Sequence, residues 1–393
     1  MAKRTSLSSN YAAAYAVKMA DVDVIAAYPI TPQTHIVEKL SEFIANGELN
    51  AEMIHVESEH SAMSASIGAS AAGARVFTAT ASQGLELMHE ILHIASGMRL
   101  PIVMAVAARA LSPPINIWSD YSDIMNARDT SWIIYIVSSA QETFDTIIQA
   151  YKLAENKDVL LPVMVGFDGF VLSHTFEAVD LPEEEEVRKF IPKQVTWYTL
   201  DPDNPLTMGP LGPPEWYYEF KYQQVVALKN ALEVARQVDD EYGKVFGRKY
   251  GLVEPYRLDD AEIAIVAYGA LASTAKAAVD EARKNGVKVG LLRLRLFRPF
   301  PVEDLVKHLE NVKAIGVMDR AIAFGAPYGG PVFADVLESL YMKGVDVNLS
   351  SFILGIGGRP MYLHDVLTVI NKVKEIADSG RRTIETYYIG VRE

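Results

Sequence analysis

The chain of 393 residues is too long for one ordinary hydrophobic core, so we expect two or three domains. Half of the residues are hydrophobic and 22% are charged, which is the balance of a globular protein, and no segment predicts a membrane span. The formal net charge of −13 argues against non-specific nucleic-acid binding, because the phosphate backbone would be repelled.

The sequence contains no cysteine, which excludes disulfides, thiolate zinc sites and ordinary iron–sulfur clusters from this chain. Its eight histidines are scattered without a familiar metal-ligand spacing. We therefore predict no metal site here, and any redox metal should lie on another polypeptide. The N-terminal residues predict the start of a helix and no export signal.

Residues 10 to about 175 predict alternating helices and strands. Helices are expected over 10–20, 31–47, 60–74, 83–98 and 141–156, and strands over 23–30, 75–82, 100–110 and 160–170. Apolar strands separated by helices are typical of a parallel sheet with helices on both faces. The fold class is therefore α/β.

Residues 176–255 differ in character from the preceding part. The acidic run at 183–186 predicts a solvated face near a linker. The Pro- and Gly-rich stretch at 201–220 predicts an irregular excursion over the surface, and 217–247 predicts one long amphipathic helix.

A second α/β unit is expected from about residue 260. Strands are predicted over 261–270, 287–301 and 314–321, and helices over 271–286 and 301–312, and the segments 333–344, 352–358 and 364–380 complete the unit. We therefore divide the chain into residues 1–250, which include the Pro-rich excursion and the long helix, and residues 256–393.

The motif YPITPQT (28–34) follows the first predicted strand. In open α/β sheets ligands bind beyond the carboxyl ends of strands, so the Thr31 hydroxyl is a candidate ligand group. The alternative is structural, with Thr31 as the N-cap of the following helix and Pro32 at its first position.

The motif VESEHSA (56–62) places Glu57 and Glu59 before a helix of small residues. Either carboxylate could cap that helix. Small side chains also permit close backbone approach at a packed seam, where a carboxyl group that shares a proton with a ring nitrogen suits general acid–base work.

Arg109 ends a predicted buried strand in AVAARALSPPINIWSD (105–120), where an unpaired guanidinium would be costly. It needs an anion, either a structural carboxylate or a ligand carboxylate bound by both of its nitrogens. Ser82, Gln83 and Gly84 lie at a strand-to-helix turn whose amides could meet a polar ligand. The charges of Asp120, Asp123, Arg128 and Asp129 are explained without function by a salt-bridged loop.

Together YPITPQT, VESEHSA, TATASQGLELMHE, ARALSPPINIWSD, ARDTSW and MVGFDGFVLSHT resemble the α subunit of the 2-oxoacid:ferredoxin oxidoreductases, thiamine-diphosphate enzymes that include pyruvate:ferredoxin oxidoreductase. Residues 260–320 resemble a transketolase C-terminal domain. The resemblance implies a pyrimidine-binding thiamine-diphosphate domain followed by a transketolase C-terminal-like domain. It implies oxidative decarboxylation of pyruvate with coenzyme A, which yields acetyl-CoA and carbon dioxide and passes electrons to ferredoxin.

The resemblance also assigns roles to residues. Glu59 matches the glutamate that binds N1′ of the aminopyrimidine ring, and Thr31 and Arg109 match the residues that hold the substrate carboxylate. Tyr28, Pro29, Ser82 and Gln83 are expected to contact the cofactor.

The chain lacks the GDG motif with which such enzymes usually hold the diphosphate through Mg²⁺. We expect it to share thiamine diphosphate with a β subunit that binds the diphosphate and Mg²⁺. The [4Fe–4S] clusters are expected on partner chains of an αβγδ assembly, in a reducing cytoplasm. Branched-chain 2-oxoacids and arylglyoxylates remain alternative substrates, and a non-catalytic scaffold, an acyl-CoA synthetase or a transketolase-like enzyme are the alternative functions.

Overall fold

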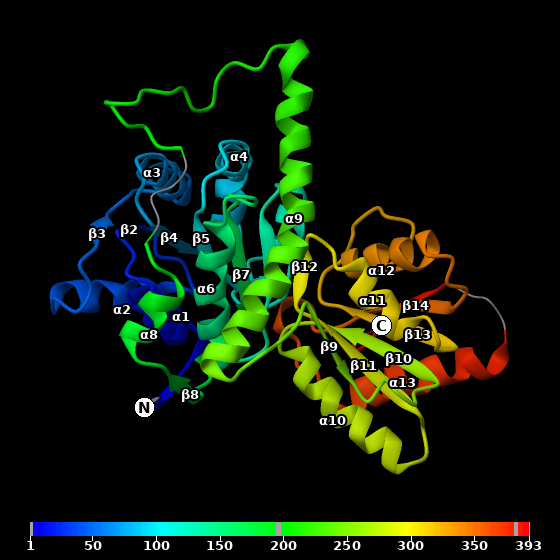
Figure 1. Ribbon diagram of the computed structural model, residues 1–393. Helices are drawn as coiled ribbons and strands as arrows, with labels where there is room; N and C mark the ends of the chain where they lie inside the picture. The colour runs from blue at the N-terminus through cyan, green and yellow to red at the C-terminus, as the bar shows by residue number, and fades with distance from the viewer. Residues whose placement is uncertain (1–2, 194–197, 381–383, 393) are drawn as a thin grey trace.

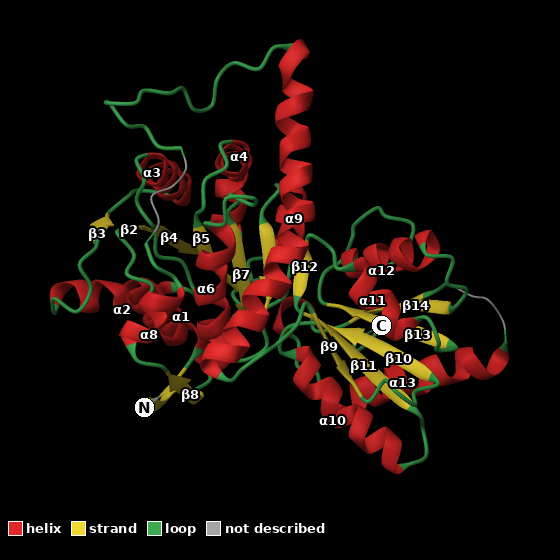
Figure 2. Ribbon diagram, viewed as in Figure 1, coloured by secondary structure: helices red, strands yellow, loops and turns green. Residues whose placement is uncertain are grey.

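The computed structural model describes residues 3–193, 198–380 and 384–392. The strands in these ranges form a seven-stranded sheet, a six-stranded sheet and a two-stranded ribbon of β1 (Lys3–Leu7) and β8 (Glu177–Leu181). The two large sheets lie next to each other, each with helices packed around it (Figures 1 and 2). Within the described ranges, no helix combines the length and the apolar character that crossing a membrane requires.

The first sheet has the spatial order β12-β6-β7-β5-β4-β2-β3. Its strands are β2 (Val24–Ala26), β3 (Glu52–Ile54), β4 (Val76–Thr80), β5 (Val103–Ala108), β6 (Ile133–Ile136), β7 (Val163–Asp168) and β12 (Leu296–Arg298). All pairings are parallel except that of β12 with β6. The predicted parallel sheet is confirmed, with one antiparallel edge strand.

Helices cover both faces of this sheet, because alternate residues of its strands pack on opposite sides. In β5, Val103, Ala105 and Ala107 belong to one hydrophobic core, and the residues between them belong to another. The helices of the first face are α1 (Ser9–Met19), α2 (Thr34–Ala45), α6 (Ala140–Ala154) and α9 (Pro214–Phe246). Those of the second face are α3 (Glu59–Ala71), α4 (Gln83–Gly97) and α5 (Ser122–Asn126), and a single 3₁₀ turn, η1 (Ala127–Asp129), follows α5.

The second sheet has the order β15-β14-β13-β10-β11-β9. Its strands are β9 (Val253–Tyr256), β10 (Ile263–Ala267), β11 (Val289–Leu294), β13 (Ala314–Asp319), β14 (Asn348–Ile353) and β15 (Thr386–Tyr388). Its helices are α10 (Leu271–Lys284), α11 (Val302–Leu309), α12 (Pro331–Met342) and α13 (Leu363–Ser379), and a 3₁₀ turn, η2 (Ile356–Gly358), follows β14. This unit confirms the second α/β fold expected from residue 260.

The two units share a hydrophobic core and buried ion pairs. Residues of α3, α4 and α5 belong to the same cluster as residues of α11 and α12. The buried Glu142 on α6 pairs with Arg293 and Arg295, at 2.8 and 2.9 Å. Because β12 lies beyond residue 256 and yet extends the first sheet, the division into residues 1–250 and 256–393 stays a prediction.

Several predicted element bounds were wrong. The segment 287–301 forms two strands, β11 and β12, which join different sheets. We predicted no strand at 133–136, where β6 lies. The stretch 176–193 contains β8 and, after it, the helix α8 (Glu184–Phe190), and the short helix α7 (Val171–His174) precedes this stretch. The acidic run at 183–186 lies at the start of α8 and is largely exposed, as expected of a solvated face.

The long helix predicted over 217–247 is confirmed as α9, which is 33 residues long. Its first turns, together with the loop that leads into them, extend beyond the body formed by the two sheets and their helices (Figure 1). They carry the exposed aromatic side chains Trp216, Tyr217, Tyr218, Phe220 and Tyr222. The preceding Pro-rich stretch contains no helix or strand over 202–213, in agreement with the predicted excursion.

Candidate active site

The candidate residues all follow strands of the first sheet at its carboxyl edge. Thr31 comes after β2, Glu59 after β3, Ser82 and Gln83 after β4, and Arg109 directly after β5. These four strands are neighbours and run parallel. The topology therefore brings the loops that carry these residues to one edge, which is where ligands bind in open α/β sheets.

Glu59 is the first residue of α3 and is 7% exposed. The helix is capped by Ser58, whose hydroxyl accepts from the Ser61 amide at 3.2 Å, so the predicted capping role of Glu59 was wrong. No hydrogen bond or ion pair reaches its carboxylate from the residues that the structure describes. The carboxylate is therefore available for a ligand.

The carboxylate of Glu59 lies against the turn between β4 and α4. A Cβ atom on Gly84 would come within 2.6 Å of Glu59 Oε1 and within 2.5 Å of Thr80 Oγ1. The Thr80 hydroxyl is itself buried without a partner in the described part of the chain. Glycine is therefore required where α3 and α4 approach each other, and two polar groups meet there.

Ser82 begins this turn in the left-handed region, with φ of 50°. Its hydroxyl donates to the Ala110 carbonyl at 2.6 Å and also lies 2.6 Å from Gln83 Oε1. The turn is thus bound directly to the residue that follows Arg109.

Arg109 is held by backbone carbonyls. Its Nε donates to the Asn116 carbonyl at 2.8 Å and its Nη1 to the Thr31 carbonyl at 3.0 Å. No carboxylate among the described residues forms an ion pair with it, so the structural salt bridge that we considered is absent there. Burial lowers the pKa of Arg109, an effect that Asp123 partly offsets. A guanidinium fixed in this way can donate hydrogen bonds to the carboxylate of a ligand.

Thr31 lies in a turn, because the Gln33 amide donates to the Ile30 carbonyl at 2.9 Å. Helix α2 begins only at Thr34 with Gln33 at its N-cap, so the predicted helix start and the capping role of Thr31 were wrong. The Gln33 side chain is buried and donates to the carbonyls of Tyr28 and Ala79, at 2.9 and 3.1 Å. This leaves Tyr28, Pro29 and Thr31 exposed on the loop.

The expected salt-bridged loop at 119–132 is only partly present. Arg128 and Asp129 approach to 3.6 Å, but Asp120 accepts from the Ser122 and Gly357 amides, each at 3.0 Å. Asp123 is fully buried and accepts from backbone amides. We predicted neither that contact nor the role of Gln33, because each depends on residues far away in the sequence.

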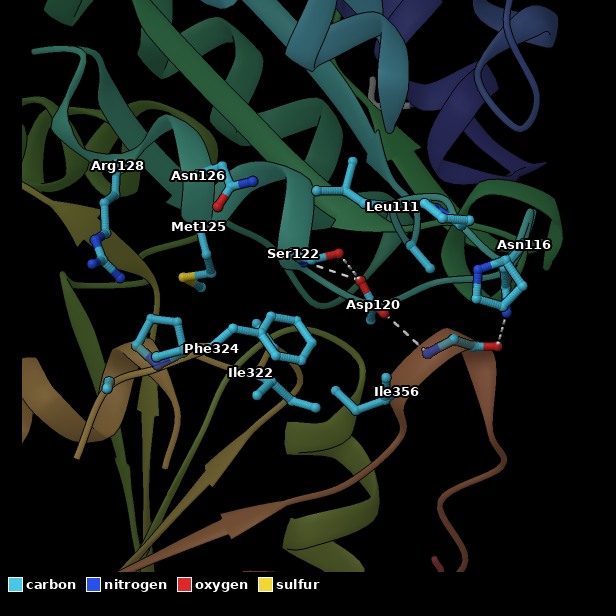
Figure 3. A pocket seen from close by; sticks show the side chains of 18 of the residues that line it. Leu111, Asn116, Asp120, Ser122, Met125, Asn126, Arg128, Ile322, Phe324 and Ile356 are labelled. Atoms are coloured by element: carbon cyan, nitrogen blue, oxygen red, sulfur yellow. Dashed lines mark hydrogen bonds between the residues drawn. The ribbon is translucent and has the colours of Figure 1, made fainter. Parts of the chain in front are cut away.

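A cavity of about 700 Å³ lies between this loop and the second unit (Figure 3). Its walls include Leu111 and Met125 on one side and Ile322, Phe324 and Ile356 on the other (Figure 3). Ala110, next to Arg109, lines it, whereas Thr31, Glu59 and Arg109 do not. The side chain of Asn116 donates to the Gly357 carbonyl at 3.0 Å and joins the loop to the second unit.

The described residues contain no group of three or more Asp, Glu or His side chains that could hold a metal ion. The polar groups at the carboxyl edge are instead a buried acid, hydroxyls, backbone amides and one arginine. This set fits an aminopyrimidine ring and a small carboxylate.

A parallel sheet with helices on both faces, an acid at its carboxyl edge and a second α/β unit agree with a protein of the thiamine-diphosphate-binding class, and the family models assign the chain to it. The family model described as "Pyruvate flavodoxin/ferredoxin oxidoreductase, thiamine diP-bdg" matches residues 15–240. The model described as "Pyruvate:ferredoxin oxidoreductase core domain II" matches residues 261–366. The chain belongs to the pyruvate:ferredoxin oxidoreductase family.

Its relatives have similar length. The chain is 52% identical to the pyruvate synthase subunit PorA of Methanocaldococcus jannaschii, with 98% of each chain covered. It is 46% identical to the ketoisovalerate oxidoreductase subunit VorA of Pyrococcus horikoshii, with 98% of this chain and 97% of that protein covered.

Among solved structures, the chain resembles the 2-oxoglutarate:ferredoxin oxidoreductase of Magnetococcus marinus, with a TM-score of 0.75 and 18% identity. The match covers 95% of this chain and 65% of that chain. A split-gene transketolase in an inactive β4 tetramer matches with a TM-score of 0.55 and 12% identity, over 94% and 99% of the two chains. At these identities the two similarities concern the fold.

Proposed function

We propose that this chain is the α subunit of a thiamine-diphosphate-dependent 2-oxoacid:ferredoxin oxidoreductase that acts on pyruvate. The reaction converts pyruvate, coenzyme A and oxidised ferredoxin into acetyl-CoA, carbon dioxide and reduced ferredoxin. The observation that carries this proposal is the Glu59 carboxylate, which is buried at the carboxyl edge of the sheet and has no partner among the described residues. The similarity to PorA over nearly the whole chain supports pyruvate as the substrate.

Glu59 is proposed to share a proton with N1′ of the aminopyrimidine ring. Its side chain is only 7% exposed, and it lies against Gly84 at the carboxyl edge of the sheet, where a bound ring nitrogen could share its proton. When bound, thiamine diphosphate supplies a nucleophilic carbon and stabilises the charge that loss of carbon dioxide leaves behind. Tyr28, Pro29, Ser82 and Gln83 are proposed to contact the cofactor from the two neighbouring loops.

Arg109 and Thr31 are proposed to bind the substrate carboxylate. The hydrogen bonds of Arg109 to the Asn116 and Thr31 carbonyls fix the orientation of its guanidinium. Thr31 is exposed on the adjacent loop, so its hydroxyl can add a hydrogen bond to the same carboxylate. Such pre-positioned donors orient the 2-oxo carbon without rearrangement on binding.

The remaining parts of the active site are proposed to lie on partner chains. A β subunit would bind the diphosphate and Mg²⁺, and γ and δ subunits would complete the complex, with the [4Fe–4S] clusters on these partners and electrons passed to ferredoxin. The absence of cysteine and of a GDG motif from this sequence supports that division. The names of the relatives as subunits support a multi-subunit enzyme, and a reducing cytoplasm is its proposed compartment.

A branched-chain 2-oxoacid is the second candidate substrate, because the relative named VorA is nearly as similar as the relatives named PorA. The kcat/KM for pyruvate and for 2-oxoisovalerate, measured by ferredoxin reduction with the assembled complex, distinguishes the two. We expect pyruvate to be preferred. A preference for 2-oxoisovalerate would reassign the substrate, and no thiamine-dependent turnover of either would contradict the proposed function.

The shared cofactor site has its own test. Thiamine diphosphate is expected to bind weakly to the isolated chain in calorimetric titration and tightly once the β partner and Mg²⁺ are added. Tight binding to the isolated chain would contradict the division of the site between two chains.

A further inference from the structure

Asp123 lies on α5 and is completely buried behind the candidate active site. Its Oδ2 atom accepts a hydrogen bond from the Ser82 amide at 2.8 Å and from the Arg109 amide at 3.0 Å. Its Oδ1 atom accepts from the Ile124 amide at 2.8 Å. One carboxylate oxygen therefore connects the turn after β4 with the end of β5.

This contact differs from those of two other buried acids near the seam between the units. Glu142 pairs with Arg293 and Arg295, and Asp145 pairs with Arg248 at 2.6 Å. Asp123 makes no ion pair with any described residue, and burial raises its pKa to about 7, with Asp120 contributing to the increase. A buried carboxylate without a counter-ion contributes little to the stability of the fold.

The two segments that Asp123 joins carry different parts of the site. The turn after β4 has Ser82 in the left-handed region and brings Gly84 against the Glu59 carboxylate. The end of β5 carries Arg109. Ser82 adds a second link, because its hydroxyl donates to the Ala110 carbonyl at 2.6 Å.

We infer that Asp123 is a positioning residue that sets the spacing between the turn that lies against Glu59 and the end of β5 that carries Arg109. The inference rests on the proposed function, since it assumes that the cofactor lies at Glu59 and the substrate carboxylate at Arg109. Asp123 itself touches neither ligand. Its contribution is to hold the Arg109 backbone in the register in which a bound 2-oxoacid meets the cofactor.

The test compares Asp123→Ala and Asp123→Asn with a matched control in the assembled enzyme. Asp319 is the control because it is equally buried and accepts from the Val332 and Phe333 amides at 3.1 and 2.9 Å, but it lies in the second unit. Losing hydrogen bonds to two buried amides changes an equilibrium constant by roughly 10- to 100-fold. We expect Asp123→Ala to raise the KM for the 2-oxoacid by about that factor relative to Asp319→Ala.

The conservative variant gives an intermediate result. The asparagine oxygen can still accept hydrogen bonds from the Ser82 and Arg109 amides, but its NH₂ group then faces the Ile124 amide, which is also a donor. The KM of Asp123→Asn should therefore lie between those of the wild type and Asp123→Ala. If Asp123→Ala does not assemble, Asp123→Asn is compared with Asp319→Asn instead. A KM of Asp123→Asn above that of Asp319→Asn supports the positioning role, and a KM equal to that of the wild type overturns it.

Equal KM values for Asp123→Ala and Asp319→Ala, with equal losses of thermal stability, would show that Asp123 is only structural. The activity of the wild-type complex distinguishes a failure of the positioning role from a failure of the proposed function. If it turns over 2-oxoacids in a thiamine-diphosphate-dependent reaction, such a result overturns the positioning role alone. If it does not, the proposed function has failed first.

Discussion

At the scale of single residues, Glu59 offers the clearest separation of function from stability. Glu59→Gln keeps the volume of the side chain and removes its ability to share a proton. Since the carboxylate has no partner among the described residues, we expect the thermal midpoint to be unchanged or higher. Turnover should fall by about 100-fold or more, the usual contribution of general acid–base catalysis.

The control for this variant is Glu57→Gln, two residues earlier. Glu57 is exposed, and its carboxylate accepts a hydrogen bond from the Ser61 hydroxyl. Steady-state rates of the reconstituted complex should be unaffected by it. Near-normal turnover in Glu59→Gln, or an equal loss in both variants, would contradict the role of Glu59.

For Asp319 we predict a contribution to folding stability that depends on pH. Burial raises its pKa to about 7, although the Val332 and Phe333 amides and the Tyr268 hydroxyl oppose the shift. Between about pH 4 and pH 7 the folded chain therefore binds a proton that the unfolded chain has released. This contribution to stability is complete below the unfolded pKa and is lost as the pH rises through about 7.

The difference in thermal midpoint between the wild type and Asp319→Asn measures this effect. It should decrease as the pH rises from about 4 to about 7 and stay constant above that range. Scanning calorimetry of both proteins across this range checks the result. A difference that grows with pH would show that the folded form holds Asp319 ionised.

At the scale of elements, the seam between α3 and α4 depends on Gly84. A Cβ there would meet Glu59 Oε1 at 2.6 Å and Thr80 Oγ1 at 2.5 Å, so Gly84→Ala must displace the acid or the helix. We expect this variant to lower turnover by about tenfold or more, because small errors in catalytic geometry are costly.

Gly97→Ala is the matched control on the same helix. A Cβ at residue 97 would meet no atom within 4 Å, and alanine favours helix by roughly 0.5–1 kcal/mol over glycine. This variant should retain its activity in the ferredoxin-reduction assay. If Gly84→Ala were equally active, the close packing of α4 against Glu59 would have no functional importance.

The repeating pattern of apolar strands and helices was sufficient to predict most elements of both sheets. It failed where distant contacts decide the structure. The short strand β6 pairs with the next strand, β7, on one side, but on the other side it pairs with β12 across more than 150 residues of chain. Helix α2 starts late because the Gln33 side chain is engaged with two backbone carbonyls.

The candidate site was predictable only in part, for the same reason. Thr31, Glu59 and Arg109 follow strands, and the positions of strand ends can be inferred from hydrophobic patterns. The residues that hold them cannot. Asp123 was grouped with the neighbouring charges, although it accepts from the Ser82 amide, 41 positions away in the sequence.

At the scale of the whole molecule, the second unit supports the active-site edge of the first. Asn116 connects the loop after Arg109 to Gly357, and the buried Arg320 pairs with Asp168 at the end of β7. Together with the shared hydrophobic core, these contacts fix the orientation of the two sheets. We infer that the second unit is required for the geometry of Arg109 even though it carries none of the proposed ligand-binding residues.

The buried cluster of Glu142, Arg293 and Arg295 tests this dependence. Glu142→Gln leaves two buried guanidinium groups without their shared carboxylate, although Arg293 keeps its pair with Glu254 at 2.6 Å. Removing one partner of a buried ion pair typically costs about 3–5 kcal/mol, so the midpoint of denaturant unfolding should fall clearly.

The control is Glu262→Gln. The carboxylate of Glu262 contacts the exposed Lys288 and Lys313 at 3.3 and 2.6 Å, and these ion pairs should contribute little to stability because water screens them. Because the second unit holds the loop after Arg109, Glu142→Gln should also raise the KM for the 2-oxoacid, whereas Glu262→Gln should not. If the two variants unfolded at the same denaturant concentration, the ion pairs between the units would not hold the sheets together.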